Sequence, residues 1–122
     1  MAHKSVVVVE DEENIAASLT FILKRAGFAV TLVNDGARAT AAVGQNRPDA
    51  VVLDVMLPNR SGLDICRDLK GNPATAAIPV LMLSAKSQDK DRTAATAAGA
   101  DHYMTKPFAN ADVVATLESL IA

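Results

Sequence analysis

The hydrophobic positions of the chain fall into short runs separated by longer segments of mixed character. The runs are Val6 to Val9, Phe28 to Val33, Ala50 to Leu53, Pro79 to Leu83 and His102 to Thr105. Short apolar runs bounded by turn residues are typical of β-strands. The first and third runs are apolar at every position, as in central parallel strands that are covered by helices on both faces. The pattern therefore predicts strands that alternate with helices around a parallel sheet.

The segments between the runs change to a helical period. Three of them carry apolar stripes, which are Ile15, Leu19, Ile22, Leu23 and Ala26; Leu63, Cys66 and Leu69; and Val114, Leu117, Leu120 and Ile121. Gly27 is predicted to follow the end of the first of these helices, and Gly71 the end of the helix that carries Leu63, Cys66 and Leu69. Residues 35–45 and 89–98 are predicted to be helical mainly because they are rich in alanine.

Turn residues cluster between these elements, and loops are predicted at 44–48, 57–62 and 72–73. Strands joined to helices by short right-handed crossovers form a three-layer, doubly wound α/β fold. We expect one such domain with a five-stranded parallel sheet over residues 1–122.

Composition narrows the function classes. The chain carries 12 lysines and arginines against 14 acidic residues, a formal net charge of −2, so it lacks the basic footprint of nucleic-acid or membrane binding. A single cysteine, Cys66, rules out an internal disulfide framework. No apolar run is long enough for a signal peptide or a bilayer span. We expect a soluble cytoplasmic protein that contacts neither nucleic acid nor membrane directly.

Reactive side chains follow the predicted strands. Glu10 and Asp11 come after the first run, Asp54 after the third, Ser84 after the fourth and Lys106 after the fifth. Carboxyl ends of parallel strands meet at one edge of a sheet, where ligands bind. Three carboxylates and one lysine there sum to about −2, which favours a divalent cation. Oxygen ligands suit Mg²⁺ or Mn²⁺, and Mg²⁺ commonly takes phosphate oxygens as further ligands.

Asp54 is the best candidate nucleophile, because its strand is central and a carboxylate can form an aspartyl phosphate. Lys106 would neutralise phosphoryl oxygens and Ser84 would donate a hydrogen bond. Taken singly, acidic residues after strands are more often helix caps, and Asp11 or Glu12 could cap the first helix. The combination at successive strand ends favours a reactive site.

These motifs resemble the receiver domain of bacterial two-component response regulators over nearly the whole chain. The matching stretches are residues 6–13, 47–58 with Gly62, 79–86 and 98–108. The resemblance implies a flavodoxin-like strand order of 2-1-3-4-5 and a cis peptide bond between Lys106 and Pro107. It implies Asp54 as phosphoacceptor, Lys106 as a phosphoryl contact, and Ser84 and Tyr103 as the switch pair. It also implies an Mg²⁺ site of Glu10, Asp11, Asp54 and the backbone carbonyl of Met56.

Departures from the family pattern accompany the resemblance. Glu10 stands where many members have aspartate, and Ser84 stands where threonine is frequent. The apolar Met56 offers no side chain to position an attacking water, which predicts slow loss of the phosphoryl group. The final helix, 109–122, lacks the arginines typical of receivers that dimerise to drive DNA-binding domains.

The leading hypothesis is a signalling module that takes phosphoryl from a histidine kinase or phosphotransfer protein. Its catalysis would be confined to its own phosphorylation and dephosphorylation. Phosphorylation would draw the Ser84 hydroxyl inward, let Tyr103 fill the vacated space and reshape the face of the fourth helix, fifth strand and fifth helix for an output partner.

Other functions remain open at this point. An aspartyl-phosphate phosphohydrolase would need a general acid at position 56, where this chain has Met56. A flavin-binding module would need a loop that binds phosphate after the first strand, where this chain has the acidic residues 10–13, which would repel phosphate. An interaction domain that is never phosphorylated would not need the complete set of acids, hydroxyl and lysine.

Overall fold

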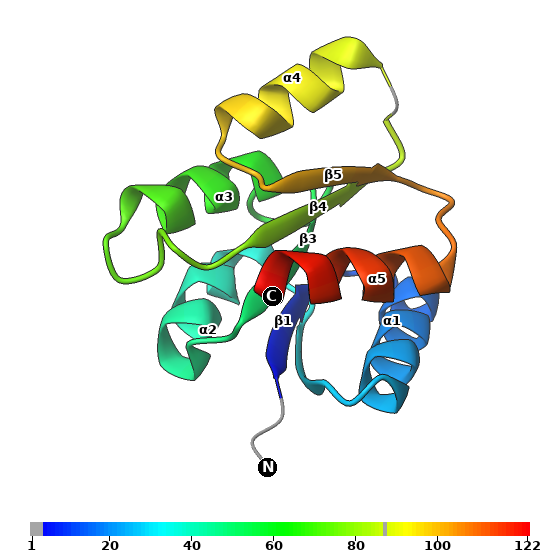
Figure 1. Cartoon of the computed structure of the whole chain (residues 1–122). Coiled ribbons are helices and arrows are strands. Elements are labelled where there is room, and N and C mark those ends of the chain that lie inside the picture. The colour runs from blue at the N-terminus through cyan, green and yellow to red at the C-terminus, as the bar shows by residue number, and fades with distance from the viewer. Residues whose placement is uncertain (1–3, 87) are drawn as a thin grey trace.

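The computed structural model describes residues 4–86 and 88–122, and its centre is a five-stranded parallel sheet in the order β2-β1-β3-β4-β5. The strands are β1 (Ser5–Val9), β2 (Ala29–Val33), β3 (Ala50–Asp54), β4 (Val80–Ser84) and β5 (His102–Thr105). Strands β1, β3 and β4 lie inside the sheet, and β2 and β5 form its edges (Figure 1). The predicted flavodoxin-like order is confirmed.

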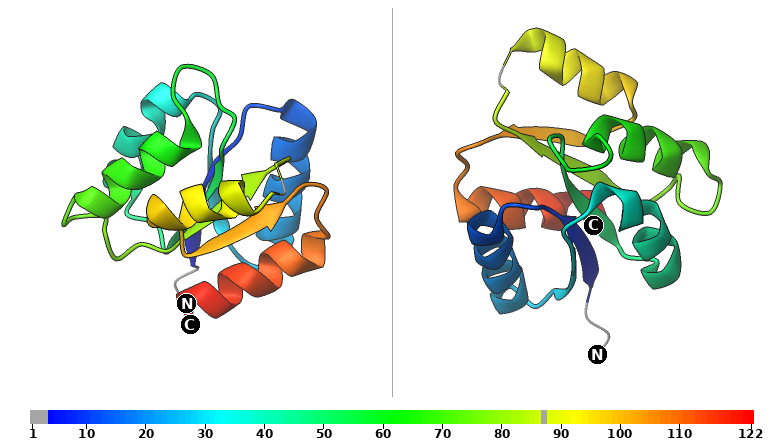
Figure 2. Two further views of the ribbon diagram at one scale, coloured as in Figure 1. Left: turned by 90° about the horizontal axis from the view of Figure 1, so that it is seen from above. Right: turned by 180° about the vertical axis from the view of Figure 1, so that it is seen from behind.

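Helices cover both faces of the sheet, as the three-layer prediction requires (Figures 1 and 2). One layer contains α1 (Glu13–Arg25) and α5 (Asn110–Ile121). The other contains α2 (Ala39–Asn46), α3 (Gly62–Gly71) and α4 (Asp89–Ala97), and a short 3₁₀ turn, η1 (Gly36–Arg38), precedes α2. Alternation along β1 divides its side chains between the layers, because Val6 and Val8 pack with α1 and α5 while Val7 and Val9 pack with α2 and α3.

The loop predicted over 44–48 and the predicted place of Gly71 after its helix were wrong. Gly44 lies inside α2, and the helix continues until Arg47, whose N–H bonds to the carbonyl of Val43 at 2.9 Å. Arg47 itself takes the left-handed conformation (φ 44°) that ends the helix, a role usually given to glycine. Gly71 is the last residue of α3 rather than the residue after it. A glycine inside a helix costs only about 1 kcal/mol, which packing of the rest of the helix can offset.

The helices differ in how firmly they hold the sheet. Leu19 and Leu23 anchor α1 at full burial, whereas Ala95 is the buried residue of α4 and Ala98 lies just beyond its end. Full burial of a leucine side chain stabilises the fold by about 1.5 to 3 kcal/mol relative to leaving it exposed, and burial of an alanine stabilises it much less. The α4 helix is therefore the more weakly anchored, as the sequence predicts.

Cys66 is fully buried on the inner face of α3, and burial raises the pKa of its thiol to about 11. This is the environment of a structural cysteine. Among the described residues, no helix has the length and apolarity that crossing a bilayer requires.

Candidate functional site

The predicted reactive residues meet at the carboxyl edge of the sheet. Glu10 directly follows β1, Asp54 and Ser84 are the last residues of β3 and β4, and Lys106 directly follows β5. Their depth in the fold is unusual for polar side chains, because Glu10 is 1%, Asp54 3% and Ser84 0% exposed. Parallel pairing in register holds these strand ends level with one another.

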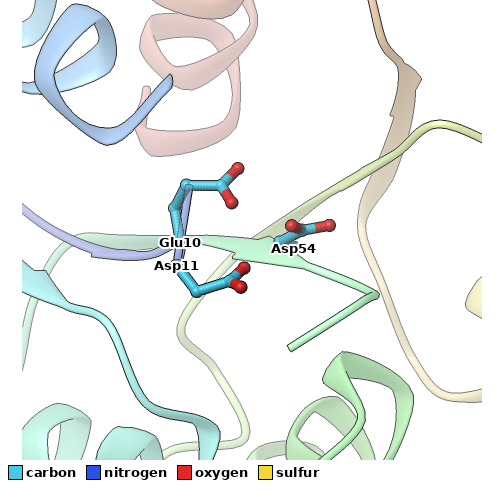
Figure 3. Close-up of side chains that lie close together, drawn as sticks. All are labelled: Glu10, Asp11 and Asp54. Carbon is cyan, nitrogen blue, oxygen red and sulfur yellow. The ribbon is translucent and has the colours of Figure 1, made fainter. Parts of the chain in front are cut away.

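Three carboxylates form a cluster at this edge (Figure 3). One oxygen each from Glu10, Asp11 and Asp54 lies within 4.8 Å of the others, with Asp11 on the exposed side. Lys106 Nζ donates to Glu10 Oε1 at 3.0 Å and to Asp54 Oδ2 at 3.1 Å. Three acids against one lysine leave a net charge of about −2, and hard oxygen donors at this spacing could hold a divalent metal ion.

The electrostatics of the cluster reflect this crowding. Burial, followed by the neighbouring Asp54 carboxylate, raises the pKa of Glu10 to about 7, although Lys106 opposes the shift. Burial disfavours the charged form of Lys106, but its hydrogen bonds to Glu10 and Asp54 outweigh burial and raise its pKa. An excess of negative charge is thus packed around one half-buried ammonium group.

Backbone contacts fix Asp54 in place. Its Oδ1 accepts a hydrogen bond from the N–H of Met56 at 3.2 Å, so both carboxylate oxygens are engaged. The start of α3 lies directly against the same segment: a Cβ atom built on Gly62 would stand 2.1 Å from the Asp54 carbonyl oxygen. Only glycine fits that approach, and Ser61 caps the helix there through Leu63 N–H.

Glu10, rather than the predicted capping residues, serves the start of α1. Glu12 is the N-cap residue, but its side chain makes no capping hydrogen bond. Its N–H instead donates to Glu10 Oε2 at 3.2 Å. The capping alternative for Glu12 is therefore wrong, and Asp11 keeps its place in the acidic cluster.

A second group of contacts links Ser84 to Tyr103. Ser84 Oγ accepts a hydrogen bond from the N–H of Lys86 at 3.1 Å, and the Tyr103 hydroxyl donates to the carbonyl of Lys86 at 2.5 Å. The main chain of Lys86 therefore joins the two side chains. Tyr103 is only 9% exposed, so its ring already occupies a buried position under α4.

Three contacts near this edge could not be predicted from the sequence. One is the main-chain role of Lys86. Another is the packing of Arg92, whose guanidinium lies 5.2 Å from the centre of the Tyr103 ring, and no sequence motif indicates either contact. Asn59 Nδ2 donates to Asp35 Oδ1 at 3.0 Å and ties the loop after β3 to the loop after β2. That bond and the Ala37 N–H lower the pKa of Asp35.

The bond between Lys106 and Pro107 is cis, as the resemblance implies. Residues 6–118 also match the family model described as the response regulator receiver domain. The chain belongs to the response regulator receiver domain family.

Curated relatives of this receiver domain are named as signalling and regulatory proteins. It is 38% identical over 117 residues to the sensory transduction protein RegX3 of Mycobacterium tuberculosis, covering 96% of this chain and 50% of the relative. It is 45% identical over 118 residues to that organism's probable transcriptional regulatory protein TcrX, covering 96% and 49%. The receiver domain thus spans about half the length of the curated relatives it matches.

Solved structures give the same picture. A putative response regulator from Chloroflexus aurantiacus superposes with a TM-score of 0.94 at 30% identity, covering 98% of both chains. The receiver domain of a sensor histidine kinase from Pseudomonas aeruginosa gives 0.91 at 29% identity over 98% of both chains, and its structure holds a magnesium ion in the active-site cleft.

Membership of the family settles the class of function. Receiver domains of response regulators are phosphoacceptor modules in signalling rather than metabolic enzymes, and as a family they work with histidine kinases and output domains. The family assignment favours this class over the phosphohydrolase and flavin-binding alternatives. The final helix, 109–122, lacks the arginines typical of receivers that dimerise to drive DNA-binding domains, so a dimer that regulates DNA binding is less favoured, and this stays a prediction.

Proposed function

We propose that this receiver domain accepts a phosphoryl group on Asp54. The observation that carries the proposal is the position of its carboxylate at the end of a central strand, with Lys106 Nζ 3.1 Å from Oδ2 and two further carboxylates beside it. The remaining polar groups at this edge would act on the phosphoryl group rather than on a separate substrate.

In the transfer step, an Asp54 carboxylate oxygen attacks phosphorus and forms an O–P bond. The N–P bond of a donor phosphohistidine breaks, and the imidazole leaves with the electron pair and takes up a proton. Lys106 pairs with a phosphoryl oxygen, since its ammonium already lies between two carboxylates, and Ser84 donates its hydroxyl to another. The chain's own catalysis would be confined to this transfer and to later hydrolysis.

Glu10, Asp11, Asp54 and the backbone carbonyl of Met56 are the proposed ligands of Mg²⁺ or Mn²⁺. Support comes from the three carboxylate oxygens within 4.8 Å and from their surplus of negative charge. When bound, the metal supplies positive charge that offsets the phosphoryl oxygens. Met56 has a 61% exposed apolar side chain, which gives an attacking water no hydrogen-bond partner and favours a long-lived phosphoryl group.

Ser84, Lys86 and Tyr103 form the proposed switch. If the Ser84 hydroxyl turns toward a phosphoryl group, its bond with Lys86 N–H weakens, and the Lys86 carbonyl that holds Tyr103 shifts with it. The weakly packed α4 lies above this connection. The face of α4, β5 and α5 would then change its affinity for an output protein or domain, while a histidine kinase or phosphotransfer protein serves as donor.

Intact-protein mass spectrometry after incubation with acetyl phosphate tests the acceptor. The wild type should gain one phosphoryl group with Mg²⁺ and lose this gain when the metal is chelated. Asp54→Asn should gain none, whereas Asp64→Asn, an exposed matched control on α3, should behave as wild type. Equal labelling of Asp54→Asn and wild type would refute the assignment.

A further inference from the structure

Arg92 on α4 covers the ring of Tyr103. Its guanidinium carbon lies 5.2 Å from the ring centre, and Nη1 lies 3.5 Å from the Tyr103 carbonyl oxygen, at the far limit of a hydrogen bond. The side chain thus reaches from the helix across the ring to the strand below. A cation over a phenol ring within about 6 Å is attracted by the ring's electrons.

No stronger interaction competes for this guanidinium in the described part of the chain. Arg92 forms no ion pair among residues 4–86 and 88–122. Its acidic neighbour Asp91 instead accepts a hydrogen bond from the N–H of Gln88 at 3.2 Å, at the start of the helix. The ring contact is therefore the principal interaction of the Arg92 head group.

The ring has few other restraints on its outer side. The α4 helix presents alanine to the sheet, with Ala95 buried and Ala98 3% exposed, and such short side chains cannot enclose an aromatic ring. The Tyr103 hydroxyl is held at one point, by the Lys86 carbonyl. A flat, charged guanidinium is well suited to close the remaining side.

We propose that Arg92 is a positioning residue that keeps the Tyr103 ring buried against the sheet and couples the ring to α4. The geometry points to a balance between a covered ring and an uncovered one, with Arg92 favouring the covered state before any phosphorylation. Its consequence for output partners rests on the proposed switch, but the covering itself does not.

The composition of the chain makes this balance directly measurable. Tyr103 is its single tyrosine and it has no tryptophan, so tyrosine fluorescence reports this ring alone. Acrylamide quenching measures how often the ring meets solvent. Arg92→Gln removes the charge, Arg92→Lys keeps it, and Arg67→Gln makes the same change at an exposed arginine on α3 that pairs with Asp64.

We expect the quencher-accessible fraction of Tyr103 to rise about two- to fivefold in Arg92→Gln, the range that an exposed cation–ring contact supports. Arg92→Lys should restore much of the protection, and Arg67→Gln should match the wild type. Urea midpoints near that of the wild type would show that α4 has not simply unfolded. Unchanged quenching in Arg92→Gln, or an equal rise in Arg67→Gln, would overturn the proposal.

Labelling with acetyl phosphate separates this inference from the acceptor assignment. Arg92→Gln should still gain a phosphoryl group, because Arg92 lies outside the acidic cluster. Altered quenching with normal labelling supports both proposals, whereas normal quenching with normal labelling contradicts only the role of Arg92.

Discussion

Replacing Gly62 with alanine would put a methyl group where the backbone after β3 already lies. The new Cβ would stand 2.1 Å from the Asp54 carbonyl oxygen and 2.9 Å from the Val55 Cα atom. Ordinary contact begins near 3.4 Å, so the carbonyl contact is short by 3.4 − 2.1 = 1.3 Å. Both obstructing atoms belong to the backbone, which cannot turn aside as a side chain can.

The start of α3 or the end of β3 must therefore move. Overpacking of this kind costs about 1 to 3 kcal/mol of unfolding free energy. The movement would also displace the Asp54 carboxylate from Lys106 and the acidic cluster, so Mg²⁺ affinity should fall along with stability.

Gly44→Ala is the matched control, because nothing lies within 4 Å of a Cβ atom at this position inside α2. There alanine should raise the unfolding free energy by about 0.5 to 1 kcal/mol through helix propensity alone. Urea denaturation and Mg²⁺ titration of both variants give the comparison. A Gly62→Ala protein as stable as wild type, with unchanged Mg²⁺ affinity, would refute the close approach of α3 to Asp54.

Three further predictions concern the reactive edge. Because the pKa of Glu10 is raised from 4.5 to about 7, its protonation should stabilise the folded state fully below pH 4.5, and this stabilisation should be lost as pH rises through 7. Urea unfolding without metal should show the fall in the free energy of unfolding, and Glu10→Gln should reduce its dependence on pH. Asp11→Ala should weaken Mg²⁺ binding and slow phosphorylation together, and a wild-type titration curve would contradict its ligand role. Ser84→Ala should still accept phosphoryl, but amide shifts on adding beryllofluoride should no longer spread over 89–103; large shifts there would contradict the switch.

The sheet and its reactive edge could be predicted from sequence because both follow from local periodicity. Apolar runs locate β1 and β3, and the residue after each run must lie at the carboxyl edge once the strands are parallel. Asp54 and Lys106 are far apart in the chain, yet the parallel arrangement of the strands places Lys106 Nζ 3.1 Å from Asp54 Oδ2.

The remaining features depend on contacts that carry no pattern. The loop after α2 was predicted to begin at Gly44, but the helix continues to Asn46 and ends at Arg47, whose left-handed conformation is usually adopted by glycine. The link between Ser84 and Tyr103 runs through backbone atoms of Lys86, which every residue possesses. No sequence motif indicates the packing of Arg92 on Tyr103, since that contact depends on how α4 lies over β5.

Mapping the modified residue tests the central claim most directly. After phosphorylation by acetyl phosphate with Mg²⁺, borohydride reduces an aspartyl phosphate to homoserine, and peptide mass spectrometry locates the change. We predict homoserine at position 54 and unmodified aspartate at 11, with no change at either position when Mg²⁺ is chelated. Homoserine at position 11, or at any acidic residue other than Asp54, would contradict the account.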